Sequence, residues 1–451
     1  DLNQAVKKKG IRSGFYYSLY EWEHSDYPQN VPLYVDNYML PQLKDAVQRY
    51  EPDIIFSDGE WDRYSIEWKS EEFLAWLYND SNAPKDVVVN DRWGGETRFK
   101  HGGYFSTEYD PNSGEMNEEF LKRGWEECRG IGKSFGYNQN ETVEDYNTSE
   151  ELIRLLVDIV SRGGNLLLNI GPKSDGTIPD IMSDRLYEIG KWLGINGRSI
   201  YGTIPNRIFQ SDGIKFTLSK DRKTLFAFVE KFQGKTLKIK GVNATGGKRI
   251  QCLGSEQALE WENKGSDLII QVNNSFIDGL QFSPLYVLEI PVLPYLDKPE
   301  VQVSIENKIA EISINSDNST STYLFEIGDS IDKNLTREYK KPFLISEPGI
   351  LHVQATNKNH LSSKIVTLPI NILTNENGLV RRTYLGWWDS CSEMINEKFT
   401  EEIIVHDFRF DQNKKDNFGH VFSGYIVINN PGIYKFQTTS DDGSRLFINS
   451  E

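Results

Sequence analysis

Cysteine is scarce in this chain of 451 residues, which contains only Cys128, Cys252 and Cys391. These three lie too far apart for the spacing of a zinc site and are too few for a disulfide scaffold, so we interpret them as small buried apolar residues. Long apolar runs are lacking as well, because no segment reaches the roughly eighteen apolar residues of a membrane-spanning helix. We therefore expect no disulfide framework and no membrane span.

Positive charge is also in short supply. Asp and Glu total 66 against 50 Lys and Arg, which gives a net charge of −16 with no long basic block to offset it. Nucleic acids and anionic membranes both select positive surfaces, so we exclude these two partners. With 38% hydrophobic residues, the chain has enough apolar surface for two to four domains.

The two ends of the sequence fall inside predicted elements. Residues 1–9 resemble the tail of a helix that runs into an apolar strand at 11–17, and residues 447–451 lie within a predicted strand. Neither an initiating Met nor a signal peptide precedes the first strand. We therefore expect the sequence to be an internal piece of a longer polypeptide.

Strands and helices alternate up to residue 202, in the pattern of a parallel sheet. The expected strands are 14–18, 53–57, 87–90 and 165–169 with a short extended piece at 103–105, and the expected helices are 36–50, 71–79, 118–131, 149–161 and 180–193. Polar residues follow each strand, as in (β/α)₈ barrels. The predicted fold class is α/β plus all-β: an incomplete (β/α)₈-type barrel, with about three strands upstream, followed by β-sandwich modules. Such a piece alone would expose strand edges, so we expect it to fold poorly and to be inactive.

Short alternating strands with Gly, Asn and Asp turns replace the helices after residue 202. Prolines at 294 and 299 and a polar stretch at 371–378 indicate linkers. The predicted domains are 1–202, 203–293, 296–373 and 379–451.

Three clusters at strand ends contain the residues suited to catalysis. Asp58 follows an apolar strand and precedes a glycine, which suits a nucleophile or general base, although a turn aspartate would have the same neighbours. Glu60 and Asp62 are expected to face solvent. The second cluster contains Asp91 and Arg92, which fit either a sugar-binding arginine beside a nucleophile or a structural ion pair between the two.

The third cluster places Glu108 beside aromatic residues, in a setting that suits a general acid or a solvated loop charge. Two carboxylates on neighbouring strand-end loops, with arginine and aromatic residues around them, are what glycoside hydrolysis requires. This chemistry needs only the carboxylates, so no metal and no cofactor are expected.

Longer strings resemble the α-L-fucosidases of glycoside hydrolase family 29. The resemblance covers roughly the first 290 residues and is carried by Phe15-Tyr16-Tyr17-Ser18, Pro52 to Trp61, Trp76 to Asp80, Val88 to Gly94, Trp125-Glu126, Ser134 to Tyr137 and Arg162 to Pro172. It implies a retaining enzyme that removes terminal fucose by double displacement, with fucosylated oligosaccharides or glycoconjugates as substrates. A non-catalytic carbohydrate-binding or adhesive protein on the same barrel is the alternative.

The resemblance also implies roles for individual residues. Asp58 corresponds to the nucleophile and Glu108 to the acid/base, with Glu126 as the competing candidate for the acid/base. The sugar-contacting positions correspond to Tyr16, Phe56, Arg92 and Phe135, and Phe56 stands where several relatives carry Trp.

The trailing modules resemble known β-domains. Residues 203–293 are similar to the sandwich that accompanies this barrel, and 296–373 to the small C-terminal sandwich of chitobiases. Residues 379–451 resemble the start of a protective-antigen-type module, carried by 422–425, 431–436 and 439–447. Asp441 and Asp442 suit either a calcium site or a turn. Such modules suggest a secreted or periplasmic protein; the sequence predicts no oligomeric state.

Overall fold

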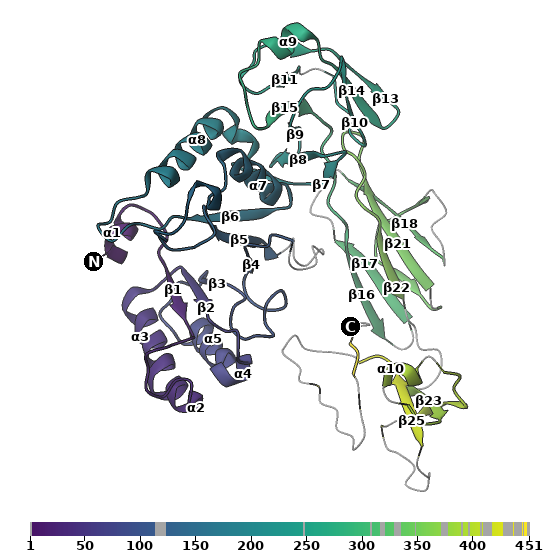
Figure 1. Ribbon diagram of the computed structural model, residues 1–451. Helices are drawn as coiled ribbons and strands as arrows, with labels where there is room; N and C mark the ends of the chain where they lie inside the picture. Colours follow the sequence, from purple (N-terminus) through teal and green to yellow (C-terminus); the bar gives the residue numbers. More distant parts are fainter. Residues whose placement is uncertain are drawn as a thin grey trace. The chain divides into compact units, whose positions relative to one another are not determined.

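The computed structural model describes residues 2–112, 123–246, 249–306, 309–315, 321–328, 335–347, 349–370, 378–388, 391–395, 397–405, 408, 417–426, 436, 444 and 446–448. The chain divides into two compact units, Asp1–Tyr295 and Leu296–Glu451. Figure 1 labels their elements. Among the helices described, none combines the length and apolar character needed to cross a bilayer. The finer division into four domains stays a prediction.

Two three-stranded parallel sheets form the first part of unit one. The first contains β1 (Gly14–Ser18), β2 (Ile54–Asp58) and β3 (Val88–Val89) in that order, and the second contains β4 (Phe105–Glu108), β5 (Trp125–Gly130) and β6 (Gly164–Asn169). The predicted α/β character of this part is therefore confirmed. The described strands form two separate sheets, and the structure does not show the predicted barrel.

Helices connect these strands. They are α1 (Leu2–Lys8), α2 (Val31–Tyr34), the π-helical η1 (Val35–Met39), α3 (Leu40–Tyr50), α4 (Ser65–Trp68), α5 (Ser70–Asn79), the 3₁₀ turns η2 (Val143–Asp145) and η3 (Gly197–Ser199), α7 (Ser149–Ser161) and α8 (Asp180–Asn196). The start of α7 shows why the sequence predicts it well. Thr148 accepts a hydrogen bond from the Glu151 amide, and Glu151 accepts one from the Thr148 amide, which satisfies amides at the helix start.

One prediction in this region is wrong. Residues 118–131 were expected to form a helix, but the described part of that segment contains strand β5. Its side chains alternate between the two sheet faces, and Trp125 and Glu127 are both buried. The charged residues that suggest a solvated helix lie instead on a strand whose residues are all buried or half-buried.

An aliphatic and aromatic core joins the first sheet to its helices. Leu43 and Val47 of α3, Ile55 of β2, and Phe73 and Leu77 of α5 belong to one buried cluster. The apolar residues recur every three or four positions along each helix, so one face of the helix packs on the sheet. This packing holds the strand ends in place.

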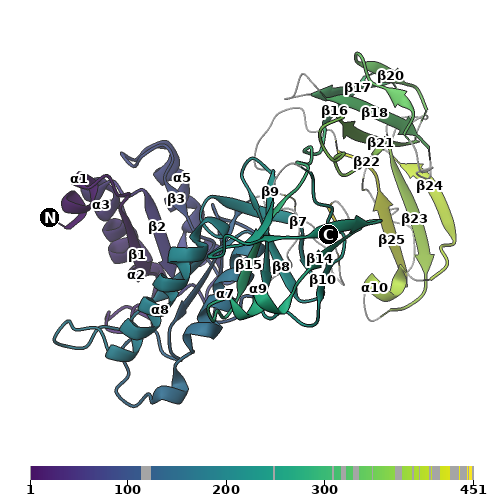
Figure 2. The ribbon, with the colours of Figure 1, turned by 90° about the horizontal axis from the view of Figure 1, so that it is seen from above.

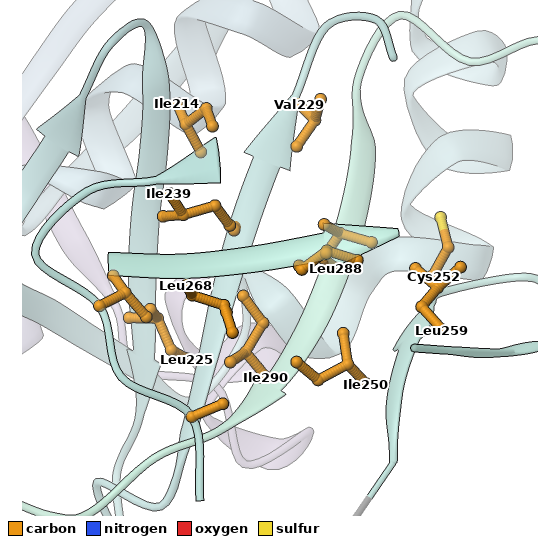
Figure 3. Close-up of a cluster of buried hydrophobic side chains, with 14 of the residues drawn as sticks. Ile214, Leu225, Val229, Ile239, Ile250, Cys252, Leu259, Leu268, Leu288 and Ile290 are labelled. Atoms are coloured by element: carbon orange, nitrogen blue, oxygen red, sulfur yellow. The ribbon is translucent and has the colours of Figure 1, made fainter. Parts of the chain in front are cut away.

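The second part of unit one is an antiparallel β-structure. One sheet has the order β12-β11-β15-β9-β8-β7 and the other β10-β14-β13. The elements are β7 (Thr203–Ser211), β8 (Ile214–Ser219), β9 (Thr224–Val229), β10 (Thr236–Ile239), β11 (Ile250–Cys252), β12 (Ala258–Leu259), β13 (Trp261–Lys264), β14 (Asp267–Gln271), α9 (Asn274–Asp278) and β15 (Tyr286–Pro291). Figure 3 shows the core between them, including Ile239, Leu268, Leu288 and Ile290.

Helices α7 and α8 cover the other face of the six-stranded sheet. Val157 of α7 and Trp192 of α8 pack with Phe226, Phe228 and Val287 in a second buried cluster. Figure 2 shows α7 beside β8 and β15. The parallel and antiparallel parts of unit one therefore share a core.

Unit two contains antiparallel sheets of its own. Two sheets have the orders β16-β17-β20 and β19-β18-β21-β22, with a core that includes Ile312 and Val353, and a third has the order β24-β23-β25. The elements are β16 (Glu300–Glu306), β17 (Ile309–Asn315), β18 (Thr322–Ile327), β19 (Arg337–Glu338), β20 (Phe343–Ile345), β21 (Gly349–Thr356), β22 (Val366–Ile370), β23 (Leu379–Leu385), α10 (Cys391–Met394), β24 (Glu401–Val405) and β25 (Phe418–Ser423). The predicted calcium-site residues Asp441 and Asp442 lie outside the described residues.

Candidate active site

The carboxyl ends of β1, β2 and β4 place the predicted site residues together. Asp58 is the last residue of β2 and Glu108 the last residue of β4. Tyr16 of β1 pairs with Phe56 of β2 in the parallel register, two residues before Asp58. Alternate residues of a strand share a face, so Phe56 and Asp58 point to the same side of the sheet.

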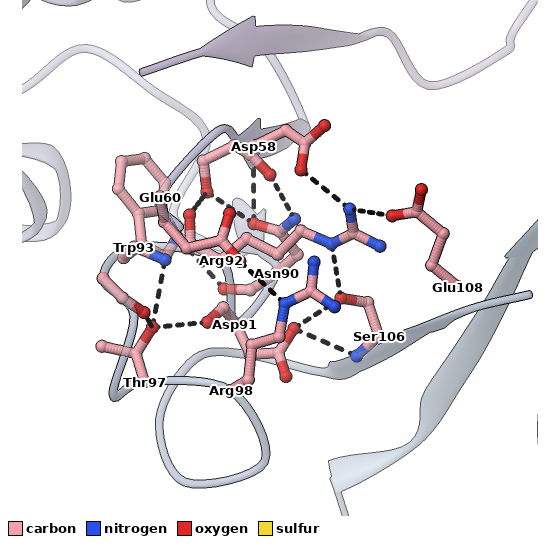
Figure 4. A network of polar contacts seen from close by, with 12 residues as sticks. Asp58, Glu60, Asn90, Asp91, Arg92, Trp93, Thr97, Arg98, Ser106 and Glu108 are labelled. Carbon is pink, nitrogen blue, oxygen red and sulfur yellow. Dashed lines mark hydrogen bonds and ion pairs between the residues drawn. The ribbon is translucent and has the colours of Figure 1, made fainter. Parts of the chain in front are cut away.

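Arg92, in the loop after β3, connects the two carboxylates. Its Nη1 donates to Asp58 Oδ1 at 2.8 Å and to Glu108 Oε2 at 2.7 Å, while its Nε donates to Ser106 Oγ at 2.9 Å (Figure 4). The guanidinium also lies over the ring of Phe56, 5.1 Å from its centre. The Arg92 side chain is 2% exposed, whereas Glu108 is 35% exposed. Arg92 is thus buried and fixed, and Glu108 remains open to solvent.

The second oxygen of Asp58 has its own donor. Tyr16 donates its hydroxyl to Asp58 Oδ2 at 2.7 Å, and its ring stacks on Phe56 with centroids 6.0 Å apart. Burial and the hydrogen bond to Asp58 raise the pKa of Tyr16 well above its usual value, so the phenol stays a donor. Two donors therefore orient the Asp58 carboxylate from two sides.

The two carboxylates beside Arg92 keep its guanidinium protonated. Burial by itself lowers the pKa of an arginine, but the hydrogen bonds and attraction of Asp58 and Glu108 outweigh burial and raise the Arg92 pKa. Its Nη2 is buried without a hydrogen-bond partner among the described residues.

Asp91 supports the site without pairing with Arg92. Its carboxylate accepts hydrogen bonds from the Ser106 amide at 3.0 Å and hydroxyl at 2.7 Å, and from the Phe99 amide at 3.0 Å. Burial raises the pKa of Asp91, and these hydrogen bonds oppose that rise. Arg92 pairs with Asp58 and Glu108, so the alternative of an Asp91–Arg92 ion pair is wrong. Asp91 instead holds the strand that carries Glu108.

Two further contacts fix the loops after β2 and β3. The Asn90 amide group donates to Ser57 O at 2.8 Å and accepts from the Ser57 hydroxyl at 2.8 Å. Glu60 accepts from Arg98 Nε at 2.7 Å and its side chain is only 2% exposed. The expectation that Glu60 faces solvent is therefore wrong, because Arg98 compensates its charge inside the protein; Asp62 is exposed as expected.

Phe135 approaches the site from the loop after β5. Its ring meets the Tyr109 ring edge to face, with centroids 4.9 Å apart, and Tyr109 directly follows Glu108. The Asn169 side chain donates to Phe135 O at 2.7 Å, which anchors the loop to the end of β6. Phe135 therefore contacts the residue that directly follows Glu108.

Glu126 occupies a different setting from Glu108. It lies on β5, in register with Ser106 of β4, and its Oε1 is buried without a hydrogen-bond partner among the described residues. Burial raises its pKa, while the charge of Arg92 opposes that rise. Cys128, two residues further along β5, is half-buried; burial raises its pKa to about 11, the charge of Arg92 opposes that rise, and the charge of Glu108 adds to it. Glu126 and Cys128 therefore face the same interior as Arg92.

Sequence reasoning missed Ser106, Asn90 and Thr97 as the residues that hold the site together. Thr97 donates its hydroxyl to Asp91 O at 2.6 Å and accepts from the Trp93 amide at 3.1 Å. Their position as small polar residues at or near strand ends is the feature of the sequence that could have identified them. In the described ranges, no group of three or more His, Cys, Asp or Glu side chains is arranged to hold a metal ion.

The chain is similar to known proteins that share one family description. The family model described as Alpha-L-fucosidase matches residues 1–198. The solved α-fucosidase of Thermotoga maritima in complex with a mechanism-based inhibitor is 34% identical, with a TM-score of 0.51, covering 64% of this chain and 67% of that one. The chain belongs to the α-L-fucosidase family. The matched range, residues 1–198, contains the positions of both carboxylates and of Arg92.

Other fucosidases extend the comparison. The α-L-fucosidase of Dictyostelium discoideum is 42% identical over 239 residues, which are 51% of each chain. The human tissue α-L-fucosidase is 38% identical over 273 residues, 58% of this chain and 57% of that one. The chain thus spans between half and three fifths of these relatives.

A second family model, described as PA14 domain, matches residues 394–451, which confirms the protective-antigen-type resemblance. The chitobiase-type resemblance of 296–373 stays a prediction.

Proposed function

We propose that the complete protein is a retaining exo-α-L-fucosidase. The observation that carries this proposal is the shared donor of the two carboxylates: both lie within hydrogen-bond distance of Arg92 Nη1. The two oxygens that share this donor can thus be no more than about 5.5 Å apart, which supports a carboxylate pair close enough for a retaining glycosidase. An inverting enzyme needs a wider gap to admit a water molecule.

In the proposed first step, a carboxylate oxygen of Asp58 attacks C1 of the fucose. The bond between C1 and the glycosidic oxygen breaks, and protonated Glu108 gives its proton to the leaving oxygen. In the second step, Glu108 removes a proton from water, which attacks C1 and releases Asp58 from the fucosyl ester. The exposure of Glu108 suits a group that exchanges protons with solvent.

The other residues bind and orient the sugar. Tyr16 and Arg92 hold the nucleophile in place, and the Nη2 of Arg92, which has no hydrogen-bond partner in the part of the chain that the structure describes, suits a fucose hydroxyl. Phe56 and Phe135 supply apolar rings for the hydrocarbon faces of the sugar. The complex of the Thermotoga maritima relative with a mechanism-based inhibitor supports fucoside hydrolysis as the activity.

We infer that the two parallel sheets are arcs of one (β/α)₈ barrel. All six strands run parallel within their sheets, and helices lie between β1 and β2, between β2 and β3, and between β5 and β6, as they do in that fold. A barrel of eight strands then needs two more, which the remainder of the complete protein would supply. The longer fucosidase relatives support this reading.

We further propose that the substrates are fucosylated oligosaccharides or glycoconjugates outside the cytoplasm, so that the protein is secreted or periplasmic. The C-terminal PA14 match supports export by analogy with the extracellular modules of glycan-degrading enzymes.

Hydrolysis of an aryl α-L-fucoside by the full-length protein and its Asp58→Gly variant tests the proposed activity. We expect the variant to lose about a thousandfold or more in kcat and to regain turnover with azide, which replaces the missing nucleophile. Glu72→Ala, which removes an acid that is 60% exposed on α5, is the control. A folded parent protein that binds fucose without hydrolysing any fucoside would instead favour the carbohydrate-binding alternative.

A further inference from the structure

Three aromatic rings stand at the surface beside the nucleophile. Trp22 is 78% exposed and Trp61 is 57% exposed, and both meet the ring of Tyr20, with centroid distances of 6.0 and 5.5 Å. We call Tyr20, Trp22 and Trp61 the aromatic platform. Large apolar side chains that gather on a surface commonly mark a binding site.

The platform is tied to the backbone of Asp58. The Leu19 amide donates to Asp58 O at 2.7 Å, one residue before Tyr20. Trp61 follows Asp58 by three residues, through Gly59 at a φ of +75°. A Cβ on Gly59 would lie 2.6 Å from Tyr20 Cβ, so the two loops touch at that glycine. The platform therefore belongs to the two loops that meet at the backbone of Asp58 and Gly59.

Two buried aromatic rings support the aromatic platform through ring contacts. Tyr20 meets Tyr27 at 4.9 Å, and Tyr27 stacks nearly parallel on Trp68, with centroids 6.2 Å apart. Tyr27 is 4% exposed and Trp68 is fully buried. Trp68 Nε1 also donates to Glu60 O at 3.3 Å. Rings held in this way lose little conformational freedom when they bind a ligand.

We propose that the aromatic platform binds the sugar ring to which the fucose is attached. This inference rests on the proposed function, because it places that ring on the leaving-group side of the cleaved bond. A pyranose presents an apolar face of C–H groups, which matches a flat indole in size and polarity. The platform would then select fucose linked to another sugar over fucose linked to a small leaving group.

The charges around the platform narrow the ligand to a neutral sugar. Glu21 and Glu23 flank Trp22 in the chain, and Asp62 follows Trp61. Their carboxylates accept hydrogen bonds from sugar hydroxyls but repel a carboxylated or sulfated ring. The expected occupant is a neutral hexose or N-acetylhexosamine.

The kinetic test uses full-length Trp22→Ala and Trp61→Ala with two substrates. One is a neutral fucosylated trisaccharide, and the other is α-L-fucosyl fluoride, whose leaving group has no ring. We expect kcat/KM to fall about tenfold for the trisaccharide, mainly through KM, and to change less than about twofold for the fluoride. Trp22→Phe, which keeps a flat ring, should recover most of the loss, and Tyr187→Ala, 71% exposed on α8, is the control.

A binding test separates the proposal about the aromatic platform from the proposed enzymatic activity. Calorimetry on the Asp58→Ala background needs no turnover and compares free fucose with the trisaccharide. Adding Trp22→Ala should weaken trisaccharide binding about tenfold and leave fucose binding unchanged. Unaltered trisaccharide binding, or equal losses of affinity for both ligands, would contradict the proposal that the aromatic platform binds the second sugar. Absence of hydrolysis by the parent protein would overturn only the proposed activity.

Discussion

Glu108 and Glu126 differ in what surrounds each carboxylate. Glu108 is partly exposed and accepts a hydrogen bond from Arg92, whereas an oxygen of Glu126 is buried without a partner among the described residues. A general acid/base must reach both the glycosidic oxygen and water. Glu108 satisfies the second condition better than Glu126, so the structure favours it for the proposed role.

Glu108→Gln should abolish proton donation, with the largest effect on fucosides whose leaving group is basic. We expect a loss of about a hundredfold or more in kcat/KM for a fucosylated sugar and a much smaller loss for an activated aryl fucoside. Glu126→Gln is the matched control and should affect both substrates equally. A leaving-group dependence that appears in Glu126→Gln instead would move the role to Glu126.

The buried Glu126 should also make stability depend on pH. Its pKa is raised by burial, so the folded protein binds this proton more tightly than the unfolded chain does. The stabilisation is present below about pH 4.3 and is lost as the pH rises through the higher pKa of the folded state. We expect Glu126→Gln to equal the parent in Tm at low pH and to exceed it by about 2 °C at neutral pH. Thermal melts across this range measure the difference, and a constant offset would contradict the assignment.

At the scale of elements, the turn after β2 decides where Asp58 lies. Gly59 has a positive φ and leaves no room for a Cβ against Tyr20. The same turn leads to the buried Glu60–Arg98 pair and to the Trp68 contact with Glu60 O. The loop is therefore a rigid support for Asp58, the proposed nucleophile.

Gly59→Ala should therefore destabilise the fold by more than the unfavourable backbone conformation alone would, because the new Cβ also clashes with Tyr20. We expect a loss of about 1–3 kcal/mol in the free energy of unfolding and most of the activity, since the loop must shift. Gly10→Ala is the control, because Gly10 has a similar φ of +71° with nothing within 4 Å of the added Cβ. Denaturant melts and aryl fucoside kinetics measure both variants; equal effects would show that the close contact with Tyr20 is unimportant.

At the scale of the whole molecule, all the candidate site residues lie in unit one. Unit one also contains the shared core of α7, α8 and the six-stranded sheet. Unit two has a separate core that includes Ile312 and Val353. The fold therefore favours a functional boundary near residue 295 over one near residue 202.

Two truncations of the full-length protein compare these boundaries. The form that ends at Tyr295 should fold and keep kcat/KM for an aryl fucoside within about twofold of the parent. The form that ends at Gly202 should aggregate, because it exposes Ile153, Val157 and Trp192. Soluble yield, melting curves and turnover distinguish the two, and an active form ending at Gly202 would contradict the shared core.

The strands and helices that sequence patterns predict best are those with strong local signals. The apolar run before Asp58 forms β2, and the helix expected at 149–161 is α7, with its capping box at Thr148. The sequence also predicted the main residues of the candidate site. Asp58, Arg92 and Glu108 lie at or just after the ends of parallel strands, where site residues were expected. Local apolar patterns and the order of strands are properties of the chain itself, so the sequence was sufficient for them.

Tertiary contacts decided the features that depend on charged residues inside the protein. The sequence of β5 has the charge pattern of a solvated helix, and only its neighbouring strands show that it is a strand. Glu60 has the sequence context of a surface acid, but in the fold it lies 2.7 Å from Arg98. The partners of Arg92 come from β2 and β4, and the core that joins α7 to β9 links segments about 70 residues apart. A charge can be buried only where an opposite charge or donor meets it. Because those partners are distant in the chain, only the folded structure identifies them.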